Sequence, residues 1–217
     1  MTDGVLPLFP LRAVLFPGRP LPLHIFEERY RALLADSLAT DRRFGVVAIR
    51  QGLEIAGGAE LFGVGTIAEI EEVEHHDDGR ADIVTRGVER FAITELLGED
   101  PYPRARVEPR PEVGLGADAP PVPCEALRSL LRPYLAGLGA PDELLTRLPR
   151  DPAELSWLTA AAVQVDLVEQ QRLLEIDGVA ERLAAIARIV RRETTIMEHL
   201  GTVASLNPPG PTGAELN

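Results

Sequence analysis

Four consecutive residues, His75-His76-Asp77-Asp78, carry the side chains of this sequence that are best suited to binding a metal. Imidazole and carboxylate groups are ordinary ligands of zinc. The four residues are adjacent, and Asp78-Gly79 is a favourable pair for a tight hairpin turn. No second group of ligands is evident at a distance in the sequence. We therefore expect a solvated turn here, with no metal and no cofactor.

Other reactive residue types also lack suitable partners. Cys124 is the one cysteine, which excludes an internal disulfide and a cysteine-based zinc site. All basic residues are arginine, and the absence of lysine excludes a Schiff base, a Ser–Lys dyad and the lysine of a P-loop. No serine lies in a G-x-S-x-G motif. We expect no catalytic residues and no enzyme activity.

The charge and hydropathy of the chain indicate which partners and which cellular location to expect. The 217 residues carry a net charge of −12, which repels nucleic acid and anionic membranes on average. The apolar stretch Leu155–Val165 is far shorter than a membrane span. The N-terminus has no basic segment followed by an apolar run, so no signal peptide is predicted. We expect a cytoplasmic protein that binds neither nucleic acid nor membrane.

The first elements that position these residues lie in a proline-rich N-terminal segment. Proline lacks an N–H and is poorly tolerated inside central strands, so the segment predicts short strands at Leu6–Leu8 and Leu21–Ile25. Glu27 and Glu28 suit the first turn of a helix that follows. The prolines are Pro7, Pro10, Pro17, Pro20 and Pro22, and one helical face is predicted from Phe26, Tyr30, Leu33, Leu34 and Leu38.

Alternating apolar residues predict further strands before residue 109. In the run Leu61–Val73, Gly63 and Gly65 indicate that another part of the protein packs closely against the strand. Phe91 is expected in the core, with Arg90 as an ion-pair partner. The remaining strand predictions are Phe44–Ile49, Ala81–Arg86, Phe91–Leu96 and Arg104–Glu108.

Composition and periodicity divide the chain into four parts. Residues 1–109 are β-rich, and residues 110–122 form a proline-rich linker. Residues 123–200 have helical periodicity, with a capping box at Asp151–Glu154 and a long last helix that ends near Leu200. Residues 201–217 are predicted to be a disordered tail.

Four blocks, in this order, resemble one known family, the substrate-binding N-terminal domain of Lon proteases. The resemblance implies an α+β fold: a twisted β pseudo-barrel of the PUA-like type with one helix, followed by a helical bundle. Because the chain has no lysine and stops after this region, we expect neither the ATPase nor the peptidase module, as in stand-alone bacterial members. The blocks are LPLFPLRAVLFPGRPLPLHIFEERYRALL, FGVGTIAEI, GVERF and LLEIDGVAERL.

The resemblance also implies a function, which is recognition of unfolded or hydrophobic polypeptide segments, or of another protein. A bound segment could add to a strand edge or lie in an apolar groove. Candidate partner-binding residues are His24, Glu28, Arg29 and Arg90. Two alternatives remain open: RNA binding, suggested only by the PUA-like fold, and a lysine-independent hydrolase in which Ser, His and an acid converge.

Overall fold

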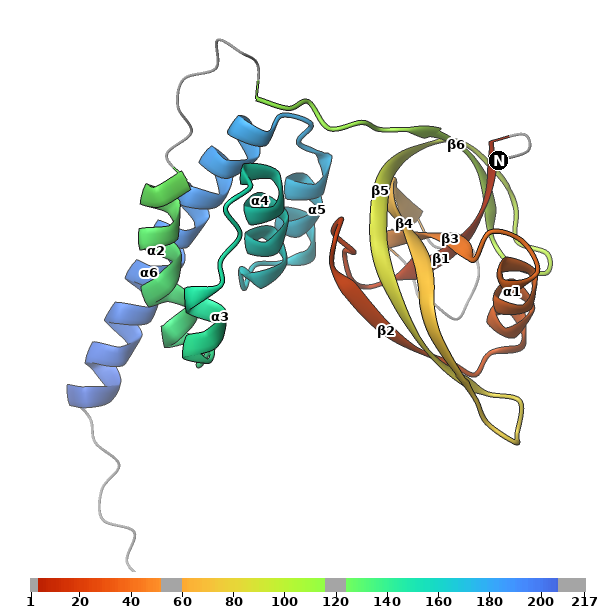
Figure 1. Cartoon of the computed structure of the whole chain (residues 1–217), viewed down its shortest axis with the longest axis horizontal. Coiled ribbons are helices and arrows are strands. Elements are labelled where there is room, and N and C mark those ends of the chain that lie inside the picture. Colours follow the sequence, from red (N-terminus) through yellow and green to blue (C-terminus); the bar gives the residue numbers. More distant parts are fainter. Residues whose placement is uncertain (1–3, 52–59, 116–123, 207–217) are drawn as a thin grey trace, which may run out of the picture.

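The structure is a computed structural model that describes residues 4–51, 60–115 and 124–206. A strand-rich N-terminal part and a group of C-terminal helices lie side by side, and residues 110–115 run from one to the other (Figure 1). The α+β class, with the strands before the helices, is as predicted. No helix among these described residues is both long and apolar enough to cross a membrane.

Six strands form one sheet, and five of them close into a ring. The sheet order is β2-β5-β4-β3-β1-β6, and β6 also pairs with β5, so β5, β4, β3, β1 and β6 close into a ring. β1 and β3 are parallel, and the other pairs are antiparallel. The predicted pseudo-barrel is this ring. The strands are β1 (Val5–Leu11), β2 (Pro20–Ile25), β3 (Arg43–Gln51), β4 (Glu60–His75), β5 (Ala81–Gly98) and β6 (Arg104–Pro109).

β5 is one strand of 18 residues, whereas the sequence predicted two shorter strands. Its first part pairs with β2 and its second part pairs with β6. Between them, the Gly18 N–H donates to Gly87 O and the Gly87 N–H donates to Arg19 O. A Cβ on Gly87 would lie 2.4 Å from the carbonyl oxygen of Phe16. The predicted break is therefore a change of strand partner, and glycine permits it.

β1 lies inside the sheet although it contains two prolines. Val5–Pro7 pairs with β6, and the pairing with β3 begins at Leu8 and ends at Leu11. Each position of β1 thus pairs in register with one neighbour only, so the missing N–H groups of Pro7 and Pro10 do not interrupt a two-sided ladder. The short strand predicted at Leu6–Leu8 was consequently too short.

The two faces of the sheet bury separate cores. Helix α1 (Glu28–Leu38) covers the outer face through Tyr30, Leu33 and Leu34 (Figure 1). Phe26, predicted on the same helical face, precedes α1 and is 58% exposed. The core inside the ring contains Leu6, Leu8, Val47, Ile67, Phe91 and Ala105, contributed by all five strands of the ring.

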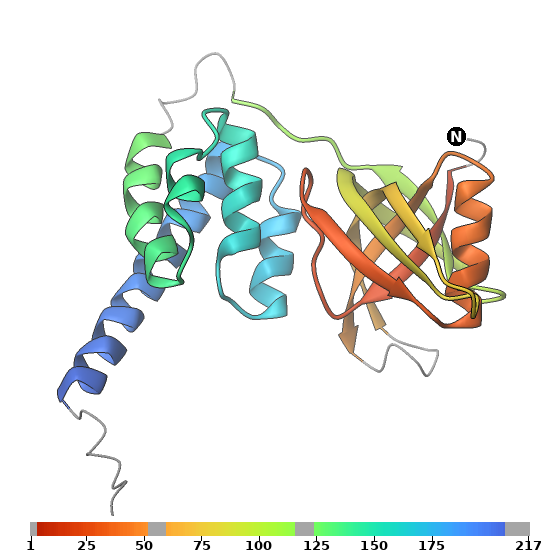
Figure 2. The same cartoon turned by 60° about the horizontal axis from the view of Figure 1, so that its bottom comes forward.

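The helical part packs around its long last helix (Figure 2). The Asp151 carboxylate accepts from the Glu154 N–H at 2.9 Å, which confirms the predicted N-cap. The last helix continues to Leu206, so residues 201–206 of the predicted tail are helical, and residues 207–217 lie outside the described residues. The helices are α2 (Cys124–Gly137), α3 (Asp142–Thr146), α4 (Pro152–Ala162), α5 (Leu167–Glu175) and α6 (Val179–Leu206).

Candidate functional site

A cavity of about 620 Å³ lies where the inside of the ring meets the turn after α1. We call it the mouth cavity. Its apolar lining belongs to the core inside the ring, and it is contributed by β1, β4, β5 and β6. Concave sites with an apolar lining and a few polar groups are the usual form of a ligand site. The apolar lining residues that belong to this core are Leu6, Ile67, Phe91 and Val107.

The polar lining of the mouth cavity is mainly acidic. Asp36, Asp41 and Glu89 supply three carboxylates against the single guanidinium of Arg43. Arg43 is itself engaged, because its Nη2 lies 2.6 Å from Glu69 Oε2 and its Nη1 lies 4.0 Å from Glu89 Oε1. A ligand with a basic group beside an apolar group would match this lining.

Tyr102 fixes one of these carboxylates. Its hydroxyl donates to Asp36 Oδ2 at 2.6 Å, and Thr40 donates to the Asp36 carbonyl at 2.9 Å. Burial, followed by the hydrogen bond to Asp36, raises the pKa of Tyr102 to about 12. The phenol therefore stays neutral at physiological pH and holds the end of α1 against the segment that leads into β6.

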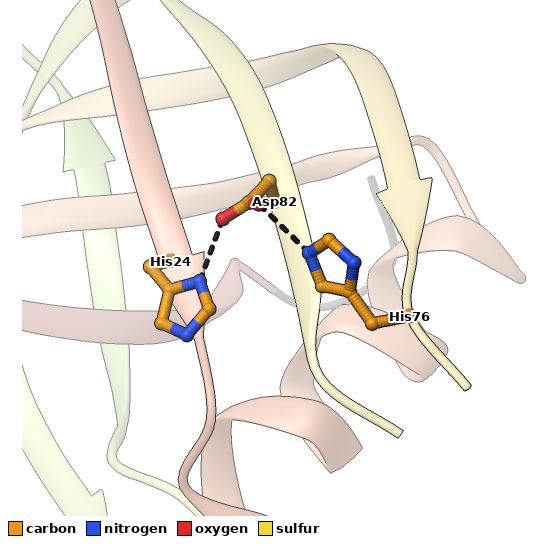
Figure 3. Close-up of side chains that lie close together, drawn as sticks. All are labelled: His24, His76 and Asp82. Atoms are coloured by element: carbon orange, nitrogen blue, oxygen red, sulfur yellow. Dashed lines mark hydrogen bonds and ion pairs between the residues drawn. The ribbon is translucent and has the colours of Figure 1, made fainter. Parts of the chain in front are cut away.

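The four residues predicted from the sequence do not form one surface. His24 lies on β2 and bonds to Asp82 (Figure 3). Glu28 begins α1 and is exposed, and the Arg29 Nε donates to Glu27 at 2.9 Å. Arg90 is 3% exposed and offers no surface to a partner. The mouth cavity was missed because its lining comes from six separate segments, and strand alternation was its only signal.

Arg90 joins the β-rich part to the helices. It donates to the carbonyls of Leu174 at 2.8 Å and Ile176 at 3.1 Å, and its Nη1 lies 3.0 Å from Asp177 Oδ1. Burial lowers the pKa of Arg90, and the Asp177 charge opposes that shift. The expectation of an ion pair for Arg90 and a core position for Phe91 is confirmed.

A second buried arginine completes this junction from the helical side. Arg182 is fully buried, and its guanidinium carbon lies 3.4 Å from the centre of the Trp157 ring. It donates to Ser156 Oγ at 2.8 Å and also pairs with Glu112. Burial lowers the pKa of Arg182 to about 10, while Glu112 acts in the opposite direction.

The predicted linker is held where the structure describes it. Arg110 lies 2.7 Å from Asp177 Oδ1, and the Val113 N–H donates to the Asp177 carbonyl at 2.9 Å. Val113 also bridges to Gly178. Residues 110–113 therefore run along the turn between α5 and α6, and residues 116–123 lie outside the described part of the chain.

The architecture is thus a closed ring of strands that is joined through buried arginines to a helical bundle. Residues 5–192 match the family described as the ATP-dependent protease La (LON) substrate-binding domain, and the chain belongs to this family. The resemblance found in the sequence blocks is thereby confirmed.

Curated relatives extend well beyond the matched region. Lon protease of Anaeromyxobacter dehalogenans is 31% identical over 207 residues, covering 90% of this chain and 24% of the relative. Lon protease 2 of Myxococcus xanthus is 32% identical over 204 residues, covering 89% of this chain and 24% of the relative. The chain thus spans about a quarter of the length of these relatives, and the match covers their substrate-binding domain but no catalytic domain.

Two solved structures have the same fold. The Lon N-terminal domain protein from Xanthomonas campestris superposes with a TM-score of 0.62 at 28% identity, covering 83% of this chain and 95% of that one. The N-terminal domain of Mycobacterium avium complex Lon protease gives a TM-score of 0.65 at 20% identity, covering 86% and 98%. The second likeness concerns the fold alone.

Proposed function

We propose that this chain is a non-catalytic module that binds polypeptide segments, and that the mouth cavity receives an apolar side chain of the bound segment. The observation that carries the proposal is an apolar cavity with an acidic lining in a member of a substrate-binding family. Burial of one leucine-sized side chain contributes about 1.5–3 kcal/mol, which suits weak, reversible binding.

Charge adds selectivity to this cavity. The lining of Asp36, Asp41 and Glu89 favours a segment with lysine or arginine beside the apolar anchor. Complementary charge mainly raises the association rate and specificity, and salt screens it. Preference for basic flanks should therefore weaken as the salt concentration rises.

Strand addition to the sheet edge is the less favourable route. Among the residues that the structure describes, β2 pairs with β5 alone, so its other side is a free edge of the described sheet. Two of its six residues, Pro20 and Pro22, have no N–H to offer to an added strand. Prolines at an edge are a common protection against strand pairing. We therefore place the bound segment in the mouth cavity.

The test uses two peptides with the same apolar centre, one flanked by lysines and one by glutamates, titrated by fluorescence anisotropy. We expect the lysine-flanked peptide to bind at least threefold more tightly at low salt. Val5, which is 38% exposed and lines the cavity, is changed in Val5→Glu, and Val168, which is exposed on α5, is changed in Val168→Glu as the control. Only Val5→Glu should weaken binding.

Equal binding by both variants, or no binding of either peptide or of unfolded casein, would contradict the proposal. RNA binding predicts instead a gel shift that is lost with added salt, although the acidic lining repels phosphate. The hydrolase alternative requires a histidine that contacts a serine. Three histidines bond to other groups instead: His24 and His76 bond to Asp82, and His199 bonds to the Thr195 carbonyl.

A further inference from the structure

Two histidines share one aspartate on the face of the sheet opposite to the one that α1 covers, since Ala81 and Ile83, on either side of Asp82, pack in the same core as α1. None of the three lines the mouth cavity. His24 Nδ1 lies 2.6 Å from Asp82 Oδ1, and His76 Nε2 lies 2.8 Å from Asp82 Oδ2 (Figure 3). One potential ligand atom from each of the three residues lies within 4.8 Å of the other two. All three side chains remain partly exposed to solvent.

Three neighbouring chain segments hold this cluster. Asp82 on β5 lies directly opposite His24 on β2 and opposite Glu74 on β4. Residues opposite one another on adjacent antiparallel strands project to the same face of the sheet. His76 follows β4 in a turn closed by its N–H to the Arg80 carbonyl at 2.9 Å. The sheet therefore supplies the distant ligands that are not evident in the sequence.

We infer that His24, His76 and Asp82 form a binding site for a divalent transition-metal ion such as zinc. Two imidazoles and one carboxylate are a frequent set of three protein ligands for zinc. Zinc bonds of about 2.0 Å place tetrahedral ligand atoms about 3.3 Å apart. The three ligand atoms already lie within 4.8 Å of one another, and the partly exposed side chains are not fixed by burial, so the groups are close to that spacing.

The surroundings suit a cation and leave a fourth ligand position. Glu74 on β4 lies directly opposite Asp82 and projects to the same face of the sheet. Glu72 and Glu74 line a hollow together with His24 and Asp82. Glu74, water or a side chain of a bound polypeptide can complete the tetrahedron. A bound ion would tie β2 to β4 and β5, and so stabilise this end of the sheet.

The experiment titrates the untagged full chain with zinc by calorimetry and by competition with a chromophoric chelator. We expect one ion per chain, and at least tenfold weaker binding in His24→Ala, His76→Ala and Asp82→Asn. His75→Ala is the matched control because His75 is adjacent to His76 but outside the cluster, and it should change the Kd less than twofold. Zinc should raise the Tm of the wild type and of His75→Ala only.

Cobalt provides an independent measurement of ligand geometry. Its visible spectrum should show tetrahedral coordination in the wild type and lose it in the three cluster variants. Far-UV circular dichroism checks that each variant is folded. Unchanged zinc affinity in all three cluster variants, or an equal loss in His75→Ala, would overturn the inference, and so would wild-type protein that binds no zinc.

Discussion

The guanidinium group of Arg182 has no exposed surface, so its charge must be stabilised by the groups that surround it. The guanidinium contacts three groups: Glu112, Ser156 and the Trp157 ring. Breaking a buried ion pair costs about 3–5 kcal/mol because the remaining charge loses its partner. In Arg182→Met the side chain keeps a similar volume. We expect the free energy of unfolding, measured in urea, to fall by about 3 kcal/mol, the low end of this range, since Glu112 is partly exposed and can regain water.

The matched control for this prediction is Arg188→Met, which alters an exposed arginine of the same helix and should change stability by less than about 0.5 kcal/mol. Adding Glu112→Gln to Arg182→Met should recover part of the loss by removing the unpaired charge. Equal stability of the two single variants would contradict the importance of this buried pair.

Asp177 makes the junction sensitive to acid. Its hydrogen bond to Arg110, helped by the charge of Arg90, lowers the pKa of the Asp177 carboxyl. A lowered pKa in the folded state contributes stability above the unfolded value of about 3.9, and that stability is lost as the pH falls through the folded value. Stability should therefore decrease below about pH 4.

Urea unfolding at a series of pH values checks this prediction. Asp177→Asn should be less stable than the wild type at neutral pH and should lose less stability in acid. Asp77→Asn, at an exposed position of the β4–β5 turn, should follow the wild-type pH profile. A wild-type profile for Asp177→Asn would show that the Asp177 charge contributes nothing to folding.

At the scale of elements, β4 carries two glycines, Gly63 and Gly65. The sequence predicts close packing at both, but their surroundings in the fold differ. A Cβ on Gly65 would lie 2.5 Å from Phe91 Cζ and 2.5 Å from the Val46 carbonyl, whereas a Cβ on Gly63 would meet nothing within 4 Å. We expect Gly65→Ala to cost about 1–3 kcal/mol, the usual range for overpacking, and Gly63→Ala to change little. Thermal unfolding of both variants measures the difference, and equal Tm values would contradict it.

Strand alternation predicted most of the elements because each face of the sheet buries a separate core. The capping residue Asp151 was predictable because its signal is local. The continuity of β5 was not predictable, since the change of strand partner near Gly87 depends on Phe16, which is distant in sequence and packs against Gly87. The mouth cavity and the histidine cluster combine residues from separate strands, and a single sequence does not give strand register.

At the scale of the whole molecule, the two parts share a core. Phe16 and Val64 from the β-rich part pack into the helical core, and Gln171 of α5 donates to the Val64 carbonyl at 3.0 Å. The Phe16 ring centre lies 6.1 Å from that of Trp157, the one tryptophan of the chain. Tryptophan fluorescence therefore reports on this junction, while far-UV circular dichroism reports mainly on the helices.

Phe16→Ala should uncouple the two parts. Phe16 is 2% exposed, and removing a buried phenylalanine side chain costs about 3–5 kcal/mol. Because the loss falls at the junction, we expect the fluorescence transition in urea to precede the dichroism transition, whereas the two coincide in the wild type. Phe26→Ala, which removes an exposed ring, should leave both transitions in place. Coincident transitions in Phe16→Ala would mean that the arginine contacts alone keep the β-rich part and the helices unfolding as one unit.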